Sequence, residues 1–131
     1  MVSALKLSST VPAGVPVCPG QEITFTCVTE GSPTIAWESI DYIDVGSQLE
    51  FGAFNHPGDS RTSPVNPDTV ATLVGSSITE DGEQVLISEL HLIALSRFPI
   101  FSVSCVHGNG TKTTIAMFVQ GKLISIMYLY L

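Results

Sequence analysis

The chain of 131 residues suits one domain, and its 44% of hydrophobic residues suffices for one packed core. The 13% of charged residues is too little for a disordered chain. A formal charge of -7, from 12 acidic and 5 basic side chains, excludes the basic surface of a nucleic-acid-binding protein and disfavours binding to anionic membranes.

The first clear strand signal follows the N-terminal region. Residues 1–12 lack the basic start and the long apolar stretch of a signal peptide. After a turn at Pro19-Gly20, apolar and polar side chains alternate over residues 23–27. This period of two predicts a strand with Cys27 on its apolar face.

The next segments predict two further strands and a loop. The turn residues 31–33 precede a short strand over residues 34–38, in which Trp37 lies on the apolar face. Residues 48–54 are a candidate strand. Residues 55–68 contain three prolines and are expected to form a loop.

A hairpin is predicted in the second half of the chain. Residues 69–78 and 84–93 are strand-like, and Asp81-Gly82 lies between them. An Asp-Gly pair between two apolar runs predicts a tight turn in which both central residues adopt positive φ.

The last strands complete an all-β pattern. Residues 101–105 alternate cleanly, with Cys105 on the apolar face, and Asn109-Gly110 predicts another hairpin turn into residues 113–119. No stretch shows a convincing helical period. Seven or more short strands at this spacing favour an antiparallel sandwich or barrel.

Three residues narrow this choice, namely Cys27, Trp37 and Cys105. A disulfide between the two cysteines would cross the core between two sheets, with Trp37 packed against it. The alternative is that both thiols are free and buried.

With this order of residues, the sequence resembles the immunoglobulin superfamily over roughly residues 3–120. The spacing Leu90-x-Leu92-x-x-Leu95 is similar to the family's pattern before the second cysteine. The resemblance implies a two-sheet antiparallel Greek-key sandwich with a Cys27–Cys105 disulfide and a core tryptophan. The long span between the cysteines leaves room for extra strands, as in variable-type domains. In its general sequence character the chain is similar to extracellular immunoglobulin-like repeats of invertebrate receptors and adhesion proteins.

Two departures from the family pattern stand near Cys105. The tyrosine that the family carries two residues before this cysteine is Val103 here, and the aspartate four residues earlier is Pro99. The Phe-Gly-x-Gly motif of antigen receptors is missing after Cys105, which argues against a rearranged antigen receptor.

The function that the resemblance implies is extracellular or cell-surface recognition of a protein ligand or of neighbouring immunoglobulin-like domains, without catalysis or a cofactor. One alternative is a carbohydrate-binding module, for which Tyr42, Phe51 and Phe54 are the local aromatic candidates. The other is a structural spacer domain of a larger surface protein.

One sheet face is the expected contact surface for a partner. Its members are Glu38, Gln48, Glu50, Ser102 and Ser104. We expect this face to be polar and acidic, so that a partner would present Lys or Arg. Asn109-Gly110-Thr111 is a glycosylation sequon on a predicted exposed turn.

Other chemistry has little support. The histidines His56, His91 and His107 do not stand at metal-ligand spacing, although Cys105 and His107 share a strand face. The acidic residues after Trp37 could bind calcium but match no calcium-binding loop, and a solvated edge is the simpler interpretation. These acidic residues are Glu38, Asp41, Asp44 and Glu50. We expect neither a metal nor a catalytic site.

Two features remain outside this scheme. Cys18 is odd by count, so it is expected to be either a buried free thiol or a partner for a cysteine outside this chain. Residues 121–131 end in nine apolar residues, whereas a membrane span needs about 20. We interpret them as a truncated span, a final strand or an artefact, and expect them to be dispensable for folding. We expect any membrane attachment to depend on an anchor outside this sequence.

Overall fold

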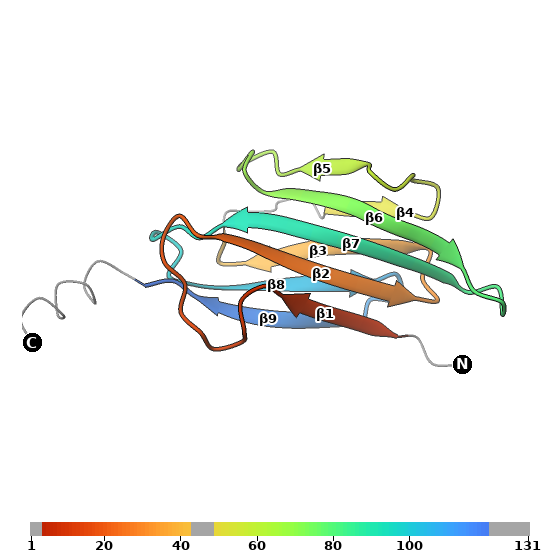
Figure 1. Cartoon of the computed structure of the whole chain (residues 1–131), viewed down its shortest axis with the longest axis horizontal. Coiled ribbons are helices and arrows are strands. Elements are labelled where there is room, and N and C mark those ends of the chain that lie inside the picture. The colour runs from red at the N-terminus through yellow and green to blue at the C-terminus, as the bar shows by residue number, and fades with distance from the viewer. Residues whose placement is uncertain (1–3, 43–48, 121–131) are drawn as a thin grey trace, which may run out of the picture.

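Nine strands are found in the computed structural model, which describes residues 4–42 and 49–120. Their bounds are β1 (Leu5–Ser9), β2 (Glu22–Glu30), β3 (Thr34–Ile40), β4 (Leu49–Gly52), β5 (Ser60–Thr62), β6 (Val70–Ile78), β7 (Gln84–Ile93), β8 (Ile100–His107) and β9 (Lys112–Phe118). They form two antiparallel sheets (Figure 1). The first sheet has the order β1-β2-β7-β6-β5, and the second has the order β4-β3-β8-β9. The predicted two-sheet sandwich is confirmed.

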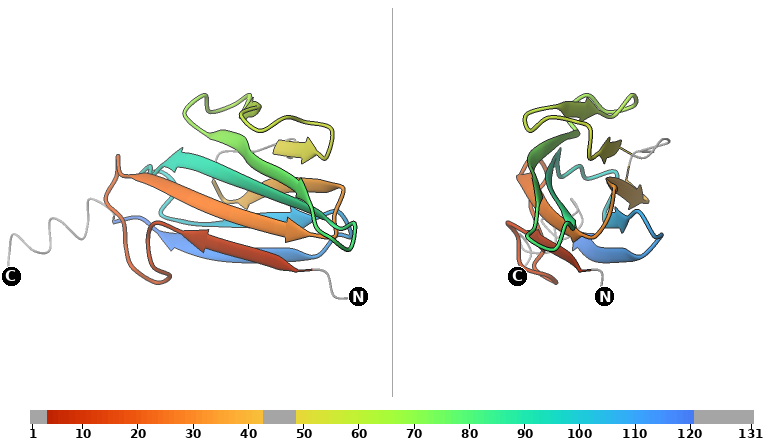
Figure 2. Two further views of the ribbon diagram at one scale, coloured as in Figure 1. Left: turned by 45° about the vertical axis from the view of Figure 1, so that its right-hand side comes forward. Right: turned by 90° about the vertical axis from the view of Figure 1, so that its right-hand side faces the viewer.

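The core lies between the two sheets, which stand side by side when viewed along the strands (Figure 2). In β2 the side chains of Ile23, Phe25 and Cys27 are buried, whereas the side chains between them are half-buried. This alternation follows from the period of two, because successive side chains of a strand point to opposite faces. The same rule buries Phe101 and Val103 of β8.

A disulfide joins the two sheets through the core. Cys27 of β2 is bonded to Cys105 of β8, and their Cα atoms are 6.4 Å apart. Trp37 lies directly opposite Cys105 in the β3–β8 register and is 1% exposed. Its indole N–H donates to Ser88 Oγ of β7 at 2.9 Å, so the buried tryptophan also links the sheets by a hydrogen bond.

A second link between the sheets is made by Tyr42, which follows β3. Its hydroxyl donates to the backbone oxygen of Ile93 at 2.6 Å and accepts a hydrogen bond from Asn66 Nδ2 at 3.3 Å. Its ring contacts Phe98 and Phe101, with centroids 5.3 and 4.8 Å away. Tyr42 therefore ties the end of β3 to the end of β7.

Position 103, where the immunoglobulin pattern has a tyrosine, is a valine. Val103 is buried in the core and has no hydroxyl that could bond to the backbone. A tyrosine hydroxyl bonded to the backbone comes instead from Tyr42, in the segment after β3. Burial raises the pKa of Tyr42 above its ordinary value of 10.0, and the hydrogen bonds to the phenol offset only part of this rise.

The hairpin turns differ from the predicted tight turns. Gly82 and Gly110 have φ values of 83° and 92°, but neither Asp81 nor Asn109 has a positive φ. Each glycine N–H instead closes a turn to the backbone oxygen three residues earlier, at 2.9 Å. The expectation that both central residues adopt positive φ is wrong, because these longer loops need left-handed backbone only at the glycine.

Two strands lie in the long span between Trp37 and β6. β4 extends the second sheet beside β3, whereas β5 pairs with β6 at the edge of the first sheet. The interpretation of residues 55–68 as a loop throughout is therefore wrong, since β5 lies within them. A variable-type domain would add both strands to the sheet that holds β3 and β8.

The N-terminal segment reaches both sheets. β1 pairs with β2, and Val17 then forms a parallel bridge to Val119 beyond β9. Cys18, next in the chain, is exposed, with its Sγ 3.7 Å from Gln120 Oε1. The expectation of a buried free thiol is wrong, because the side chain lies outside the sandwich.

Three of the sequence predictions fall outside the described residues. These concern Asp44, Gln48 and the tail of residues 121–131. Within residues 4–42 and 49–120, no helix is long and apolar enough to cross a membrane.

Replacing Cys27 and Cys105 together by alanine should lower the free energy of unfolding by about 2–5 kcal/mol, because the unfolded chain loses its cross-link. Chemical denaturation measures this change. The matched control is Cys18→Ala, which removes an exposed thiol and should change the stability by less than about 0.5 kcal/mol. Equal losses in both variants would contradict the assigned bridge.

Tyr42→Phe should lower the free energy of unfolding by about 1–3 kcal/mol, because the partners of its hydroxyl remain buried without it. Phe54→Leu, at a side chain that is 94% exposed, is the control and should be nearly neutral. A neutral Tyr42→Phe would show that the hydroxyl does not hold the sheets together.

The raised pKa of Tyr42 also predicts a pH dependence. The folded protein holds the phenol proton more tightly than the unfolded chain does. This part of the stability is complete below the ordinary pKa of 10.0 and is lost as the pH rises above it. Denaturation at increasing alkaline pH should therefore show a steeper loss for the wild type than for Tyr42→Phe, and parallel curves would refute the burial effect.

Candidate interaction surface

The outward face of the second sheet carries Glu38, Glu50, Ser102 and Ser104, the described residues among those expected to contact a partner. In the strand register Glu38 of β3 lies opposite Ser104 of β8, which in turn lies opposite Thr114 of β9. Glu50 lies on β4 opposite Ala36 of β3. Because directly paired residues point to the same side of a sheet, these side chains share one face.

The polar side chains of this face bond to one another. Glu38 Oε2 accepts a hydrogen bond from Lys112 Nζ at 2.6 Å, with the lysine half-exposed. Ser104 is buried, with its Oγ 2.7 Å from Thr114 Oγ1. These contacts leave Glu50 as the exposed acidic group among the predicted residues that the structure describes.

The other half of the face is apolar. Ile40, Ile100 and Phe118 are 62%, 61% and 40% exposed. Ile100 lies directly opposite Phe118, and Ile40 lies opposite Ser102, whose other neighbour is Ala116. We call Ile40, Ile100 and Phe118, with Ser102 and Ala116 between them, the apolar patch.

The expectation that this face is predominantly polar and acidic is wrong for the apolar patch. The sequence predicts one strand over residues 34–38 and another over residues 101–105. Ile40 and Ile100 lie just outside these ranges, so the sequence assigns neither to a sheet face. In the structure β3 continues to Ile40 and β8 begins at Ile100. The period of two then directs both side chains outward, beside Ser102.

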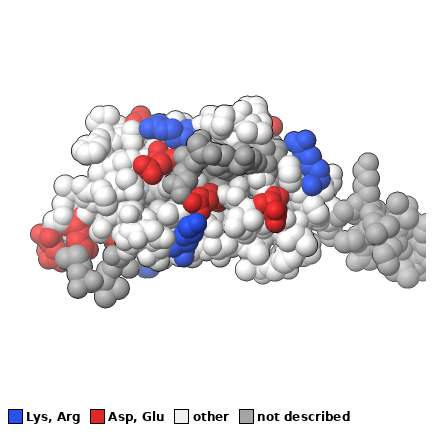
Figure 3. Space-filling model, turned by 180° about the vertical axis from the view of Figure 1, so that it is seen from behind, with Lys and Arg blue, Asp and Glu red and all other residues white. Residues whose placement is uncertain are grey.

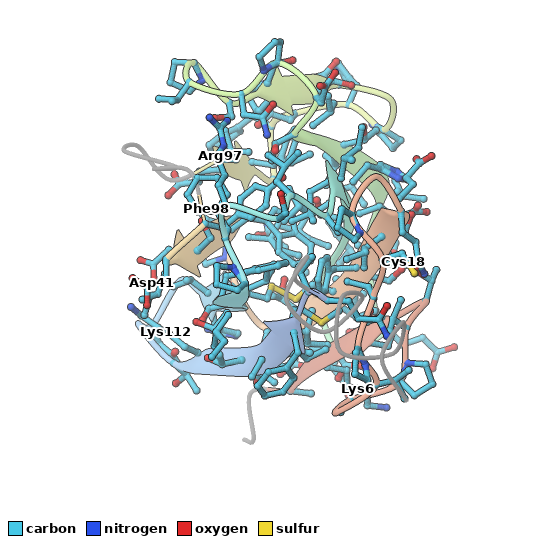
Figure 4. The ribbon with its side chains drawn as sticks, turned by 90° about the vertical axis from the view of Figure 1, so that its left-hand side faces the viewer. Lys6, Cys18, Asp41, Arg97, Phe98 and Lys112 are labelled. Carbon is cyan, nitrogen blue, oxygen red and sulfur yellow. A yellow bond between two sulfur atoms is a disulfide. The ribbon has the colours of Figure 1, made fainter. Side chains whose placement is uncertain are left out.

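Charged side chains are few on the side of the molecule that carries the second sheet. Figure 3 views this side and shows a few acidic and basic side chains, some of them adjacent, on a largely uncharged surface. Asp41 follows Ile40 and has a φ of 63°. In Figure 4 the side chains of Arg97, Phe98, Asp41 and Lys112 lie along one side of the molecule. Asp41 is therefore next to the apolar patch in the chain, whereas Lys112 lies at the other end of β9 from Phe118.

The aromatic residues do not form a platform for sugars. Tyr42 and Phe51 are buried, and the Arg61 guanidinium lies over the Phe51 ring at 4.9 Å. Phe54, at the turn after β4, is the exposed member of the three. Stacking of a sugar ring needs exposed aromatic faces, so two of the three candidates cannot provide it.

His107, the histidine beside Cys105, is hydrogen-bonded to the protein backbone. His107 is buried, with Nε2 2.9 Å from the backbone oxygen of Glu30, and Nδ1 accepts the backbone N–H of Asn109 at 3.2 Å. Since a backbone N–H can only donate, the bonded ring nitrogen must be unprotonated. Cys105 lies in the disulfide and cannot act as a thiolate ligand beside His107.

No group of three or more His, Cys, Asp or Glu side chains in the described part of the chain is arranged to hold a metal ion.

A shallow hollow lies between the β2–β3 turn and the β6–β7 turn. It is lined by Gly31, Ser32, Pro33 and residues 81–84. The Ser32 hydroxyl is already engaged, since it accepts the backbone N–H of Gly108 at 2.7 Å.

Comparisons with known proteins give structural similarity alone. No protein-family model and no curated protein matches the sequence. A solved structure described as IgNAR antibody domain C1 is 8% identical, with coverage of 88% of this chain and 91% of that chain and a TM-score of 0.41. One described as IgNAR antibody domain C3 is 14% identical, with coverage of 92% and 97% and a TM-score of 0.44.

A third solved structure is described as Rst D1-D2. It is 14% identical, with coverage of 88% of this chain and 47% of that chain and a TM-score of 0.46. Similarity as low as this does not indicate a function. The strand order, the disulfide between the sheets and the buried tryptophan give this chain an immunoglobulin-like fold.

Proposed function

We propose that this domain is a recognition module that binds a protein partner through the outward face of its second sheet, without catalysis. The observation that carries the proposal is the apolar patch, in which two isoleucines and a phenylalanine are exposed on adjacent strands. Adjacent exposed apolar side chains rimmed by polar residues are typical of protein-binding surfaces.

The two halves of the face have different roles in this proposal. Burial of the apolar patch against a partner supplies affinity, at about 25 cal/mol for each Å² removed from water. The exposed carboxylate of Asp41 follows Ile40 in the chain, that of Glu50 lies farther along the same sheet face, opposite Ala36, and both attract basic side chains. Such charges mainly increase the association rate and the specificity of binding.

The surroundings of the face are consistent with a cell-surface or extracellular role. A Cys27–Cys105 disulfide persists best in an oxidising compartment. Asn109 lies exposed at the β8–β9 turn, and we propose that it carries an N-linked glycan. The apolar patch lies at the opposite ends of β8 and β9, so this glycan would leave it free.

The partner in this proposal is a protein ligand or a neighbouring immunoglobulin-like domain of a longer protein. An exposed apolar patch favours a protein over a sugar, because the aromatic candidates for sugar stacking are mostly buried. A purely structural spacer would use the face for a fixed contact with a neighbouring domain.

The test is a screen of the multimerised domain against a panel of extracellular protein domains, followed by variants of the face. Ile100→Asp should weaken the binding of a selected partner at least about tenfold, which corresponds to about 1.4 kcal/mol. The matched control is Ile78→Asp, at an isoleucine of β6 that is 69% exposed on the other sheet. Binding that both variants leave unchanged, or that both weaken equally, would refute the proposed face.

The same partner also tests the charged margin. Glu50→Lys and Glu38→Lys should both slow association at low salt, because a basic partner meets fewer carboxylates. The larger effect on stability is expected for Glu38→Lys, which also loses the bond to Lys112. Unchanged association rates for both variants at low salt would show that the acidic side chains face away from the partner. Binding of glycans in place of proteins would favour the carbohydrate-binding alternative.

A further inference from the structure

The β8–β9 turn holds an asparagine that is followed by glycine. Residues 108–111 are all exposed, and Asn109 lies at the centre of the turn. The chain has two other asparagines, Asn55 and Asn66, which precede His56 and Pro67. Asn109 is therefore the one asparagine of the sequence whose next backbone nitrogen belongs to a residue without a side chain.

The hydrogen bonds of this turn polarise the Asn109 side chain. The backbone N–H of Thr111 donates to Asn109 Oδ1 at 2.8 Å. This bond draws electron density from the side-chain carbonyl carbon, and it would stabilise negative charge on Oδ1 if a nucleophile attacked that carbon. The nearest backbone nucleophile in the sequence is the nitrogen of Gly110, which can close a five-membered ring with that carbon.

One bond of the turn opposes this attack. The Gly110 N–H donates to the backbone oxygen of His107 at 2.9 Å. Because the tip of the turn is exposed, water can replace this bond at little cost. The bond from Thr111 to Oδ1 lies on the other side of Asn109 and does not need to break.

We propose that Asn109 is a site of spontaneous deamidation in chains in which it carries no glycan. A solvent base removes the Gly110 amide proton, and the nitrogen forms a bond to the Asn109 side-chain carbonyl carbon. The side-chain nitrogen takes up a proton and leaves as ammonia, which gives a cyclic imide. Water then opens either carbonyl of the ring and leaves an aspartyl or isoaspartyl residue at position 109.

This conversion goes beyond the proposed recognition function. It adds one negative charge to a chain whose formal charge is -7, and the isoaspartyl product lengthens the backbone of the turn by one carbon. A glycan on the Asn109 side-chain nitrogen would block the reaction, because the substituted amide is bulkier and the turn is shielded. Glycosylated and unglycosylated chains would therefore differ in how long the turn stays intact.

The experiment uses the full chain, secreted into the bacterial periplasm so that the disulfide forms without glycosylation. The folded protein is incubated at mildly alkaline pH, and peptide mapping by mass spectrometry follows each asparagine. We expect Asn109 to convert at least about ten times faster than Asn55, because ring closure is an intramolecular reaction that glycine leaves unhindered. An isoaspartyl methyltransferase should label the converted peptide.

The other two asparagines, Asn55 and Asn66, are internal controls for the deamidation rate, and Asn109→Gln is the test variant. Asn66 is buried and precedes a proline that has no N–H, so it should remain an amide. Asn109→Gln should abolish the fast conversion without unfolding the domain, because the side chain is exposed. Equal rates at Asn109 and Asn55, or an unchanged Asn109 during a time in which a synthetic peptide of residues 104–114 converts fully, would overturn the proposal.

Discussion

The Cys27–Cys105 bridge is the constraint on which the rest of this domain depends. It joins the interior strands β2 and β8 of the two sheets, and Trp37 packs at the same level with its indole N–H bonded across to β7. A cross-link between interior strands holds the two sheets together, with the Cα atoms of the bridged residues 6.4 Å apart. The inward side chains then fill the space between the sheets, and on the outward face of the second sheet Ile40, Ile100 and Phe118 remain exposed.

Much of this core could be predicted from the sequence. The strict alternation around Cys27 and Cys105 placed both cysteines on apolar faces, because a strand buries every second side chain. The role of Tyr42 could not be predicted in the same way. Its hydroxyl meets Ile93 and Asn66, which are far from it in the sequence and come close only when the two sheets pack. The sequence shows the missing tyrosine near Cys105 but not its replacement.

The candidate surface was predicted only in part, for two physical reasons. Alternation identified the polar members around Glu38, but strand ends are poorly marked by short patterns, so Ile40 and Ile100 were not assigned to the face. Pairing across strands also depends on register, which single-strand patterns do not contain. The bond between Glu38 and Lys112 joins β3 to β9 and could not be seen from either strand alone.

Ile40 and Ile100 are exposed in the free domain. We propose that a protein partner covers both side chains. The most direct measurement is the broadening of their methyl NMR signals by a soluble paramagnetic probe, with buried Ile23 and Ile35 as internal references. We expect strong broadening of the Ile40 and Ile100 signals in the free domain and protection of both in the complex. Methyl signals that are already protected in the free domain, or that stay exposed in the complex, would contradict the proposal.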